Sequence, residues 1–312
     1  MSAAEPARVA VVGAGAIGGW VAARLALAGN AVMALTSRGP CEEIAIEEGG
    51  DRAVAQLSMF GGAADLLVLA AKATSLGAAA RAAVPLIGPA TLVVPMQNGV
   101  PWWFVDGQPL QSVDPDNSIA AALPLERVIG CVVHASCRRT APGCVQVKHA
   151  DKLILGEPGG GSSERVARLY EVFETAGIHC EASADVRRAI WYKLWGNATI
   201  NPLSALTRAP CDAILADPDC RAWMLEGMAE LAAVGAAIGC PISESGEDRM
   251  AVTARLGSFK TSMLQDVEAG RPIELEALLG APREIARGHG TATPALDRLY
   301  GVTRLMADSL GL

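Results

Sequence analysis

Three polar side chains recur at a regular interval within an otherwise apolar stretch, KLWGNATINPLSALT (193–207). Lys193, Asn197 and Asn201 follow one another at a spacing of four residues. Four residues advance a helix by about 40°, so the three side chains would share one stripe roughly 12 Å long. An ammonium group is costly to bury alone, so we expect Lys193 to face a cleft or a partner, where it could transfer a proton. The alternative is the solvated face of an amphipathic helix.

A second segment, which we also expect to be helical, is KTSMLQDVEAGRPIELEALLG (260–280). Ser262 and Glu274 are the groups in it that could bind a small polar substrate. Glu274 lies between two apolar residues, directly after an Arg-Pro pair. A solvated glutamate at a helix start is the alternative interpretation of this residue.

A glycine-rich motif, Gly13-Ala14-Gly15-Ala16-Ile17-Gly18, directly follows a predicted strand and opens a predicted helix. In this context the first glycine allows a tight turn, the second lets the backbone approach a pyrophosphate, and the third packs helix on strand. The amides of the helix N-terminus, with Ala16 and Ile17, would then hold the phosphates. A sharp turn without a ligand is the alternative.

The end of the second predicted strand bears on which cofactor is bound. A site for NAD would have an Asp or Glu there for the ribose hydroxyls. This chain has Leu35-Thr36-Ser37-Arg38-Gly39, without an acid. Ser37 can donate a hydrogen bond to a 2′-phosphate and Arg38 can bind it as a charged fork, so the sequence favours NADPH. Otherwise Arg38 is an exposed turn residue.

Two further polar residues follow predicted strands. Lys72 comes after LLVLAA (66–71), and Asn98 comes after TLVVP (91–95). Ligands of open α/β sheets bind at the carboxyl ends of the strands. Each residue could simply be a turn residue, but their shared placement beside the glycine motif makes both candidates for the cofactor site.

The elements that would position these residues differ between the two halves of the chain. Short apolar runs at 8–12, 31–35, 66–71 and 91–95 alternate with helical or turn-rich segments, which indicates a mostly parallel sheet covered on both faces. Runs at 128–137, 143–149 and 152–156 are predicted to be later, partly antiparallel strands of the same sheet.

Beyond about residue 185 the sequence is almost wholly helical, with prolines between the helices. We therefore predict an α/β fold with two domains. An N-terminal Rossmann-type, NADP-binding domain would cover residues 1–184, and a C-terminal all-helical domain with the substrate and catalytic residues would cover 185–312. A length of 312 residues fits two domains.

Composition excludes several classes of function. The net charge is −7 without a block of Lys or Arg, so neither nucleic acid nor a membrane surface is an expected partner. The first residues lack the features of a signal peptide, and no apolar run is long enough to cross a bilayer. We expect a soluble, cytoplasmic protein whose eight cysteines are reduced, without a metal site. The oligomeric state stays open, and a homodimer is one option.

Together these motifs resemble ketopantoate reductase (2-dehydropantoate 2-reductase) over nearly the whole chain. The likeness rests on GAGAIG (13–18), Lys72, QNGV (97–100), KLWGNATINPLSAL (193–206) and SMLQD…GRPIE (262–274). It implies an active site between a Rossmann domain and a helical domain, and the reduction by NADPH of a 2-oxo acid to a 2-hydroxy acid, in the pantothenate pathway when the substrate is ketopantoate.

The resemblance also implies a role for each candidate residue. Lys193 would be the general acid at the substrate carbonyl, and Glu274 would hold a substrate hydroxyl and help to orient Lys193. Asn98 would contact the nicotinamide side, with Lys72 near cofactor and substrate. Asn197, Asn201 and Ser262 would hold the hydroxyl and carboxylate of the substrate.

The sequence departs from the family pattern at three places. Phe259 stands where another substrate-binding asparagine is expected, and Cys211 replaces a further polar residue. Trp102, Trp103 and Phe104 lie in a loop that could be core packing or an apolar lid. These departures concern the substrate, which could be a bulkier or more apolar 2-oxo acid than ketopantoate.

Two other functions compete with this hypothesis. A β-hydroxyacid dehydrogenase also joins a Rossmann domain to a helical domain with a Lys-x-x-x-Asn pair, but the SMLQD…GRPIE block argues against it. A catalytically idle NADP-binding sensor or scaffold would need the glycine motif but neither Lys193 nor Glu274.

Overall fold

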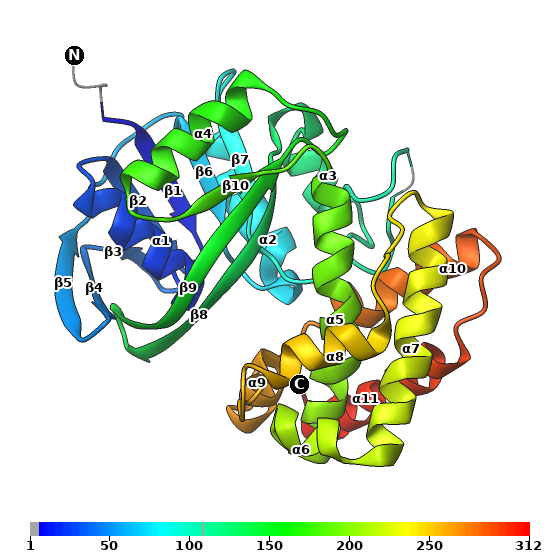
Figure 1. Cartoon of the computed structure of the whole chain (residues 1–312). Coiled ribbons are helices and arrows are strands. Elements are labelled where there is room, and N and C mark those ends of the chain that lie inside the picture. The colour runs from blue at the N-terminus through cyan, green and yellow to red at the C-terminus, as the bar shows by residue number, and fades with distance from the viewer. Residues whose placement is uncertain (1–5, 108) are drawn as a thin grey trace. The chain divides into compact units, whose positions relative to one another are not determined.

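The computed structural model describes residues 6–107 and 109–312 (Figure 1). Within them the chain forms two compact units. The first contains the described residues up to Gln97 together with Asn117–Ala189, and the second contains Asn98–Asp116 and Ile190–Leu312. Of the helices described, none combines the length and apolar character that crossing a bilayer would need. All eight cysteines lie in the described part and are free thiols, as predicted.

The first unit contains the predicted parallel sheet. Its strands run in the order β3-β2-β1-β6-β7. They are β1 (Arg8–Val12), β2 (Ala31–Thr36), β3 (Gly39–Cys41), β6 (Leu66–Leu69) and β7 (Leu92–Pro95). All neighbours pair in parallel except β3, which is antiparallel to β2 at the edge. The four predicted strands are therefore confirmed, and their carboxyl ends share one edge of the sheet.

A second sheet in the first unit corrects the prediction that residues 128–156 extend the parallel sheet. It is formed by β4 (Glu43–Glu48), β5 (Asp51–Gln56), β8 (Gly130–Ala141), β9 (Cys144–Gly156) and β10 (Cys180–Ala182). The runs predicted as two strands at 143–149 and 152–156 form the single strand β9. This strand pairs with β4, which lies about 100 residues earlier and which sequence analysis placed in a turn-rich segment.

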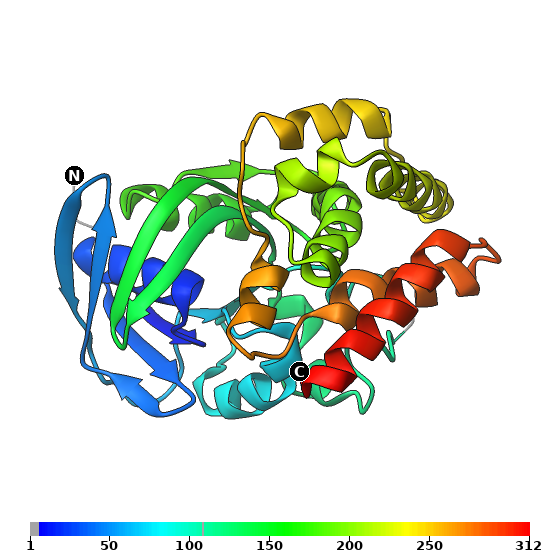
Figure 2. The same cartoon turned by 90° about the horizontal axis from the view of Figure 1, so that it is seen from below.

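Helix α1 (Ala16–Leu27) lies between the two sheets and contacts strands of both. Figure 2 shows the long ribbon of β8 and β9 curving past this helix. Its sequence, AIGGWVAARLAL, is apolar on nearly all sides, which suits a helix that is covered on opposite faces. The core of the first unit accordingly combines residues of α1 with residues of both sheets. Because α1 is packed on both sheets, the glycine motif at its start has a fixed position.

The described residues of the first unit form three further helices. They are α2 (Leu76–Ala83), α3 (Ser118–Ala122) and α4 (Glu164–Thr175), with 3₁₀ turns η1 (Ala73–Ser75), η2 (Val84–Leu86) and η3 (Leu125–Arg127). Helix α5 (Val186–Thr207) begins in this unit and continues through the second.

The second unit is helical, as predicted. Besides most of α5 it contains α6 (Cys211–Ala216), α7 (Pro218–Ala237), α8 (Gly246–Ala254), α9 (Ser262–Glu268), a π-helical turn η4 (Glu276–Gly280), α10 (Ala281–Gly288) and α11 (Pro294–Leu310). The segment 260–280 is thus not one helix. Gly270 adopts a positive φ of 61° and Pro272 cannot continue a helix, so α9 ends in a turn and residues 271–274 are neither helix nor strand.

Buried tryptophans attach α5 to α7. The indole Nε1 of Trp191 donates to the carbonyl of Leu231 at 3.0 Å, and that of Trp195 donates to Met228 at 2.8 Å. Phe104 stacks on Trp191, with ring centroids 5.7 Å apart. Like Phe104, its neighbours Trp102 and Trp103 are almost fully buried, so this loop is core packing rather than a lid.

The loop that contains Trp102 and Phe104 also changes the predicted boundary between the two parts of the chain. Residues Asn98–Asp116 belong to the second unit, whereas the sequence grouped them with residues 1–184. The carboxylate of Glu284 holds the far end of this loop by accepting hydrogen bonds from the backbone amides of Gln111 and Ser112, both at 2.8 Å. Which domain binds cofactor and which binds substrate stays a prediction.

Two helical glycines of the second unit test this packing. A Cβ at Gly235 in α7 would lie 2.4 Å from Trp191 Nε1, whereas a Cβ at Gly301 in α11 would meet no atom within 4 Å. We expect Gly235→Ala to lower the free energy of unfolding by about 1–3 kcal/mol through overpacking. Gly301→Ala should raise it by about 0.5–1 kcal/mol. Equal unfolding midpoints in denaturant for the two variants would contradict the close packing of Trp191 on α7.

Candidate active site

The glycine motif makes a turn that only glycine allows at its first and last positions. Gly13 has a φ of 97°, and a Cβ there would lie 2.3 Å from the backbone nitrogen of Ala71. A Cβ at Gly18 would lie 2.3 Å from the carbonyl oxygen of Gly13. The amides of Gly13 and Ala14 both donate to the carbonyl of Leu35, at 2.9 and 3.0 Å. The turn is therefore tied to the end of β2.

Gly15 differs from both of these glycines. The nearest atom to a Cβ there is the carbonyl oxygen of Gly13, at 3.9 Å, so the structure leaves open space above Gly15. Gly15 is also the N-cap of α1, and among the described residues no side chain caps this helix and no acid lies in its first turn. Amides at an uncapped helix start favour an anion. The arrangement fits the approach of a pyrophosphate.

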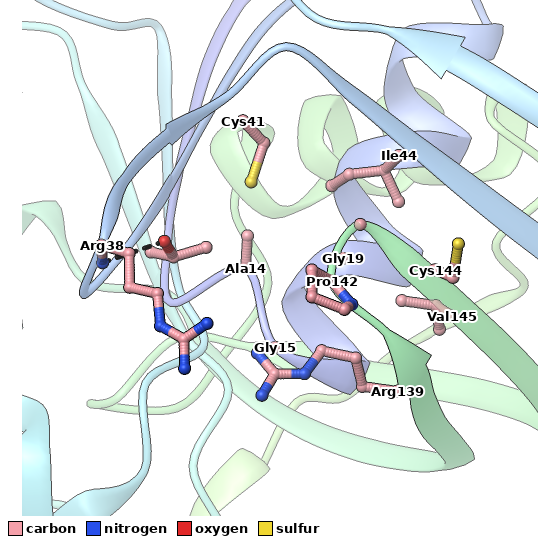
Figure 3. Close-up of a pocket in the computed structure, with 12 residues that line it drawn as sticks. Ala14, Gly15, Gly19, Arg38, Cys41, Ile44, Arg139, Pro142, Cys144 and Val145 are labelled. Carbon is pink, nitrogen blue, oxygen red and sulfur yellow. Dashed lines mark hydrogen bonds between the residues drawn. The ribbon is translucent and has the colours of Figure 1, made fainter.

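A pocket of about 170 Å³ opens beside Gly15 (Figure 3). Its lining residues come from the glycine motif, the β2–β3 turn and the tip of the β8–β9 hairpin. They are Ala14, Gly15, Gly19, Thr36, Arg38, Cys41, Ile44, Arg139, Pro142, Gly143, Cys144 and Val145. Two of them are arginines, and no acidic residue lines the pocket. Such a pocket suits an anionic ligand.

The pocket brings together only some of the residues predicted to bind a cofactor. Gly15 and Arg38 line it, whereas Ala16, Ile17, Gly18 and Ser37 do not. Arg38 and Ser37 are both exposed in the turn between β2 and β3. Thr36 holds this turn, since its hydroxyl donates to the carbonyl of Gly39 at 2.9 Å and accepts from the amide of Arg38 at 3.1 Å.

The carboxyl ends of β6 and β7 are joined by Gln97. Its amide Nε2 donates to the carbonyls of Leu69, at 2.7 Å, and Ala71, at 3.2 Å. Its Oε1 is buried without a hydrogen-bond partner among the residues that the structure describes. An unpaired buried acceptor at this edge of the sheet is a candidate to accept a hydrogen bond from a ligand. Lys72 is partly exposed at the same edge, directly before η1.

Lys193 and Asn98 meet in the second unit. Nζ of Lys193 donates to Oδ1 of Asn98 at 2.8 Å, although the two residues lie 95 positions apart in the sequence. Asn98 is thus a hydrogen-bond partner for the Lys193 ammonium, which would be costly to bury alone among the apolar residues of α5. Because an amide oxygen accepts a hydrogen bond without accepting a proton, Asn98 orients Lys193 and leaves its remaining N–H groups to other acceptors.

The backbone beside Asn98 is held by the turn η4. The amide of Val100 donates to the carbonyl of Ala277 at 2.8 Å. Gly99 has a φ of 85°, and a Cβ there would lie 2.4 Å from that same carbonyl oxygen. The close approach of the two backbones therefore requires glycine, and it fixes Asn98 against the segment that follows Glu274.

The other predicted substrate residues also lie in the second unit. Asn197 is half-buried on α5, and Asn201 is 5% exposed. Ser262 is exposed as the first residue of α9, and Glu274 is half-buried just before η4. The predicted helix around the row of three is thus confirmed, while the roles of these residues stay predictions.

Two of the three departures from the family pattern are neighbours in the structure. The amide of Cys211 donates to the carbonyl of Phe259 at 2.9 Å. The Cys211 side chain is fully buried, and burial raises the pKa of its thiol to about 12, so it stays neutral. Neither side chain therefore offers a charged group to a substrate.

Sequence analysis missed two cations near the candidate groups. Arg139 reaches the pocket from β8, more than 100 residues after the glycine motif. Arg249 lies over the ring of Tyr192 at 5.7 Å, beside Gly196 of α5, and burial lowers the pKa of its guanidinium. Neither belongs to a recognisable motif, so only the tertiary structure identifies them.

The fold and these groups define the class of the protein. A Rossmann-type unit with an open glycine motif, followed by a helical unit with a lysine–asparagine pair, is the framework of a pyridine-nucleotide-dependent oxidoreductase. Comparison with family models identifies the family within this class. Residues 9–160 match "Ketopantoate reductase PanE/ApbA" and residues 185–307 match its C-terminal domain. The chain belongs to the ketopantoate reductase family, whose members are oxidoreductases acting on CH–OH groups.

Individual relatives agree with this assignment. The chain is 39% identical to the 2-dehydropantoate 2-reductase of Mesorhizobium japonicum, over 97% of this chain and 99% of the relative. It is 31% identical to that of Halobacterium salinarum, over 78% and 76%. A crystal structure of a candidate ketopantoate reductase from Ralstonia solanacearum MolK2 superposes with a TM-score of 0.92 at 45% identity, covering 99% and 100% of the two chains.

The open space above Gly15 yields a prediction. Gly15→Ala should lower the free energy of unfolding less than Gly18→Ala does, because the new methyl at Gly15 meets no protein atom within 3.9 Å, and its cost comes only from a ψ of −141° that alanine disfavours. The affinity for a pyridine dinucleotide, measured by calorimetry, should fall about 10-fold or more because the methyl occupies the approach of the pyrophosphate. Gly18→Ala, the matched control, should lose stability as well. Unchanged affinity in Gly15→Ala would refute the assigned position of the phosphates.

Proposed function

We propose that this chain is an NADPH-dependent reductase that converts a 2-oxo acid, ketopantoate or a related compound, into the 2-hydroxy acid. The observation that carries the proposal is the hydrogen bond between Lys193 Nζ and Asn98 Oδ1. It presents an oriented ammonium on α5 beside the buried side chains of Leu194 and Trp195. Membership of the ketopantoate reductase family supports the same class of reaction.

The first unit has the features that a dinucleotide needs. The open space above Gly15 and the uncapped start of α1 would accommodate the phosphates of the dinucleotide. The unpaired Oε1 of Gln97 would accept a hydrogen bond from a donor of the dinucleotide. Arg38 and Ser37 would bind a 2′-phosphate, and the lack of an acid at the end of β2 favours NADPH over NADH. Lys72 would lie near both cofactor and substrate. When bound, NADPH supplies a hydride to the oxo carbon of the substrate.

Lys193 would supply the proton. As the oxo carbon accepts the hydride, negative charge develops on its oxygen, and an ammonium group stabilises that charge and then protonates the oxygen. Asn98 would fix the direction of one N–H of Lys193, so that another N–H can point to the substrate. As the family resemblance implies, the reaction needs a nicotinamide bound by the first unit to meet a substrate bound by the second.

The remaining candidates would bind the substrate. Asn197, Asn201 and Ser262 offer donors to its hydroxyl and carboxylate oxygens, and Glu274 would accept from a substrate hydroxyl and help to orient Lys193. Phe259, which is half-buried, and Cys211, which is fully buried, are apolar residues where the family pattern has polar groups. They favour a 2-oxo acid with a more apolar substituent than that of ketopantoate.

A panel of 2-oxo acids that includes ketopantoate tests the reaction. Oxidation of NADPH is followed for each compound at equal concentration, and the same panel is repeated with NADH. We expect at least one 2-oxo acid to be reduced, with NADPH preferred. If none is reduced with either cofactor, the proposed function is wrong.

The proposed general acid is tested with the best substrate of that panel. Lys193→Ala should lower kcat by roughly 10²–10⁴-fold, because proton transfer is lost. Affinity for NADPH should change by no more than about twofold, since the phosphate groups are bound elsewhere. Lys260→Ala is the matched control, because Lys260 is an exposed lysine of the same unit that pairs with Glu268 at 2.6 Å. Near-normal turnover of Lys193→Ala would eliminate the assigned mechanism.

A further inference from the structure

Arg139 is a second cation in the pocket of the first unit. It is exposed near the end of β8 and lines the pocket together with Arg38. Within the described part of the chain, neither guanidinium makes a hydrogen bond or an ion pair with another side chain. In Figure 3 Arg38 enters from the turn between β2 and β3 and Arg139 enters from β8, and their guanidinium groups point toward one another beside Gly15.

The position of Arg139 is fixed by the β8–β9 hairpin. The amide of Ala45 donates to the carbonyl of Gly143 at the tip of this hairpin, at 2.8 Å. Val145, the strand partner of Arg139, packs against α1 so closely that a Cβ at Gly19 would lie 2.9 Å from its methyl group. Arg139 is thus carried by a paired strand that is packed on the helix of the glycine motif.

The charges in this pocket are unbalanced. Two cations face one space without an acid in its lining, although the whole chain has a net charge of −7. Arg139 and Cys41 line the same space, and the positive charge of Arg139 opposes the rise that burial causes in the pKa of the Cys41 thiol. Two converging guanidinium groups match a dianionic phosphate, which accepts a charged fork from each side.

We propose that Arg139 and Arg38 together bind the 2′-phosphate of NADPH, so that Arg139 is a second determinant of the preference for NADPH over NADH. This inference rests on the proposed function and extends it to a residue in the second sheet. The 2′-hydroxyl of NADH carries no charge and gains little from the second arginine. A site with both arginines should therefore discriminate more strongly than one with Arg38 alone.

The test compares the binding of 2′,5′-ADP and 5′-AMP to the full chain by calorimetry. Arg139→Ala should weaken 2′,5′-ADP about 10-fold or more and change the affinity for 5′-AMP by no more than about twofold. Arg138→Ala is the matched control: it removes the same charge from the adjacent residue of β8, whose side chain lies on the opposite face of the strand and does not line the pocket. Both variants should have the same unfolding midpoint as the parent chain, since both arginines are exposed.

Arg38→Ala separates the inference from the proposed function. If Arg38→Ala loses affinity for 2′,5′-ADP while Arg139→Ala behaves like Arg138→Ala, the role of Arg139 is refuted and the preference for NADPH stands. If the parent chain binds 2′,5′-ADP no more tightly than 5′-AMP, both the role of Arg139 and the proposed cofactor are refuted. Equal loss for both ligands in Arg139→Ala also overturns the inference, because it indicates a contact outside the 2′-phosphate.

Discussion

The hydrogen bond from Lys193 to Asn98 joins two segments that are 95 residues apart, and a catalytic role for Lys193 depends on both staying in place. Much of the second unit serves that requirement. Trp191 and Trp195 attach α5 to α7, so the helix that carries Lys193 cannot rotate without breaking two buried hydrogen bonds. Phe104 packs the other segment onto the same helix by stacking on Trp191.

The segment that carries Asn98 is held at both ends. Near its start, Val100 bonds to the carbonyl of Ala277, and toward its far end the carboxylate of Glu284 binds two backbone amides. An ammonium in apolar surroundings is stabilised only when such a partner is available at a constant distance. The apolar residues of α5 therefore fix the position of the helix. Its polar residues, Lys193, Asn197 and Asn201, then have a fixed position from which they can bind a ligand.

Local patterns were sufficient for much of this fold. Continuous apolar runs identified the parallel strands, and the glycine motif identified the turn in which Gly13 and Gly18 have no room for a side chain. The spacing of Lys193, Asn197 and Asn201 identified one face of α5. Each of these features depends on a few neighbouring residues, so periodicity and turn chemistry describe them well.

Features that depend on distant residues could not be predicted in this way. Strand β4 was missed because its partner β9 follows about 100 residues later, and the loop after Asn98 was grouped with the wrong neighbours because its burial depends on Trp191 and Glu284. Arg139 looks like any exposed arginine of a hairpin until the second sheet places it beside Gly15. The contact between Lys193 and Asn98 belongs to the same group, since the sequence named both residues without bringing them together.

A double-mutant cycle on this pair tests the central claim most directly. Turnover at saturating cofactor and substrate is measured for the parent chain, Asn98→Ala, Lys193→Ala and the double variant. If Asn98 acts by orienting the ammonium of Lys193, Asn98→Ala slows the parent chain strongly and adds little once Lys193 is gone. If Asn98→Ala slows both backgrounds by the same factor, the two residues act independently and the orienting role of Asn98 is contradicted.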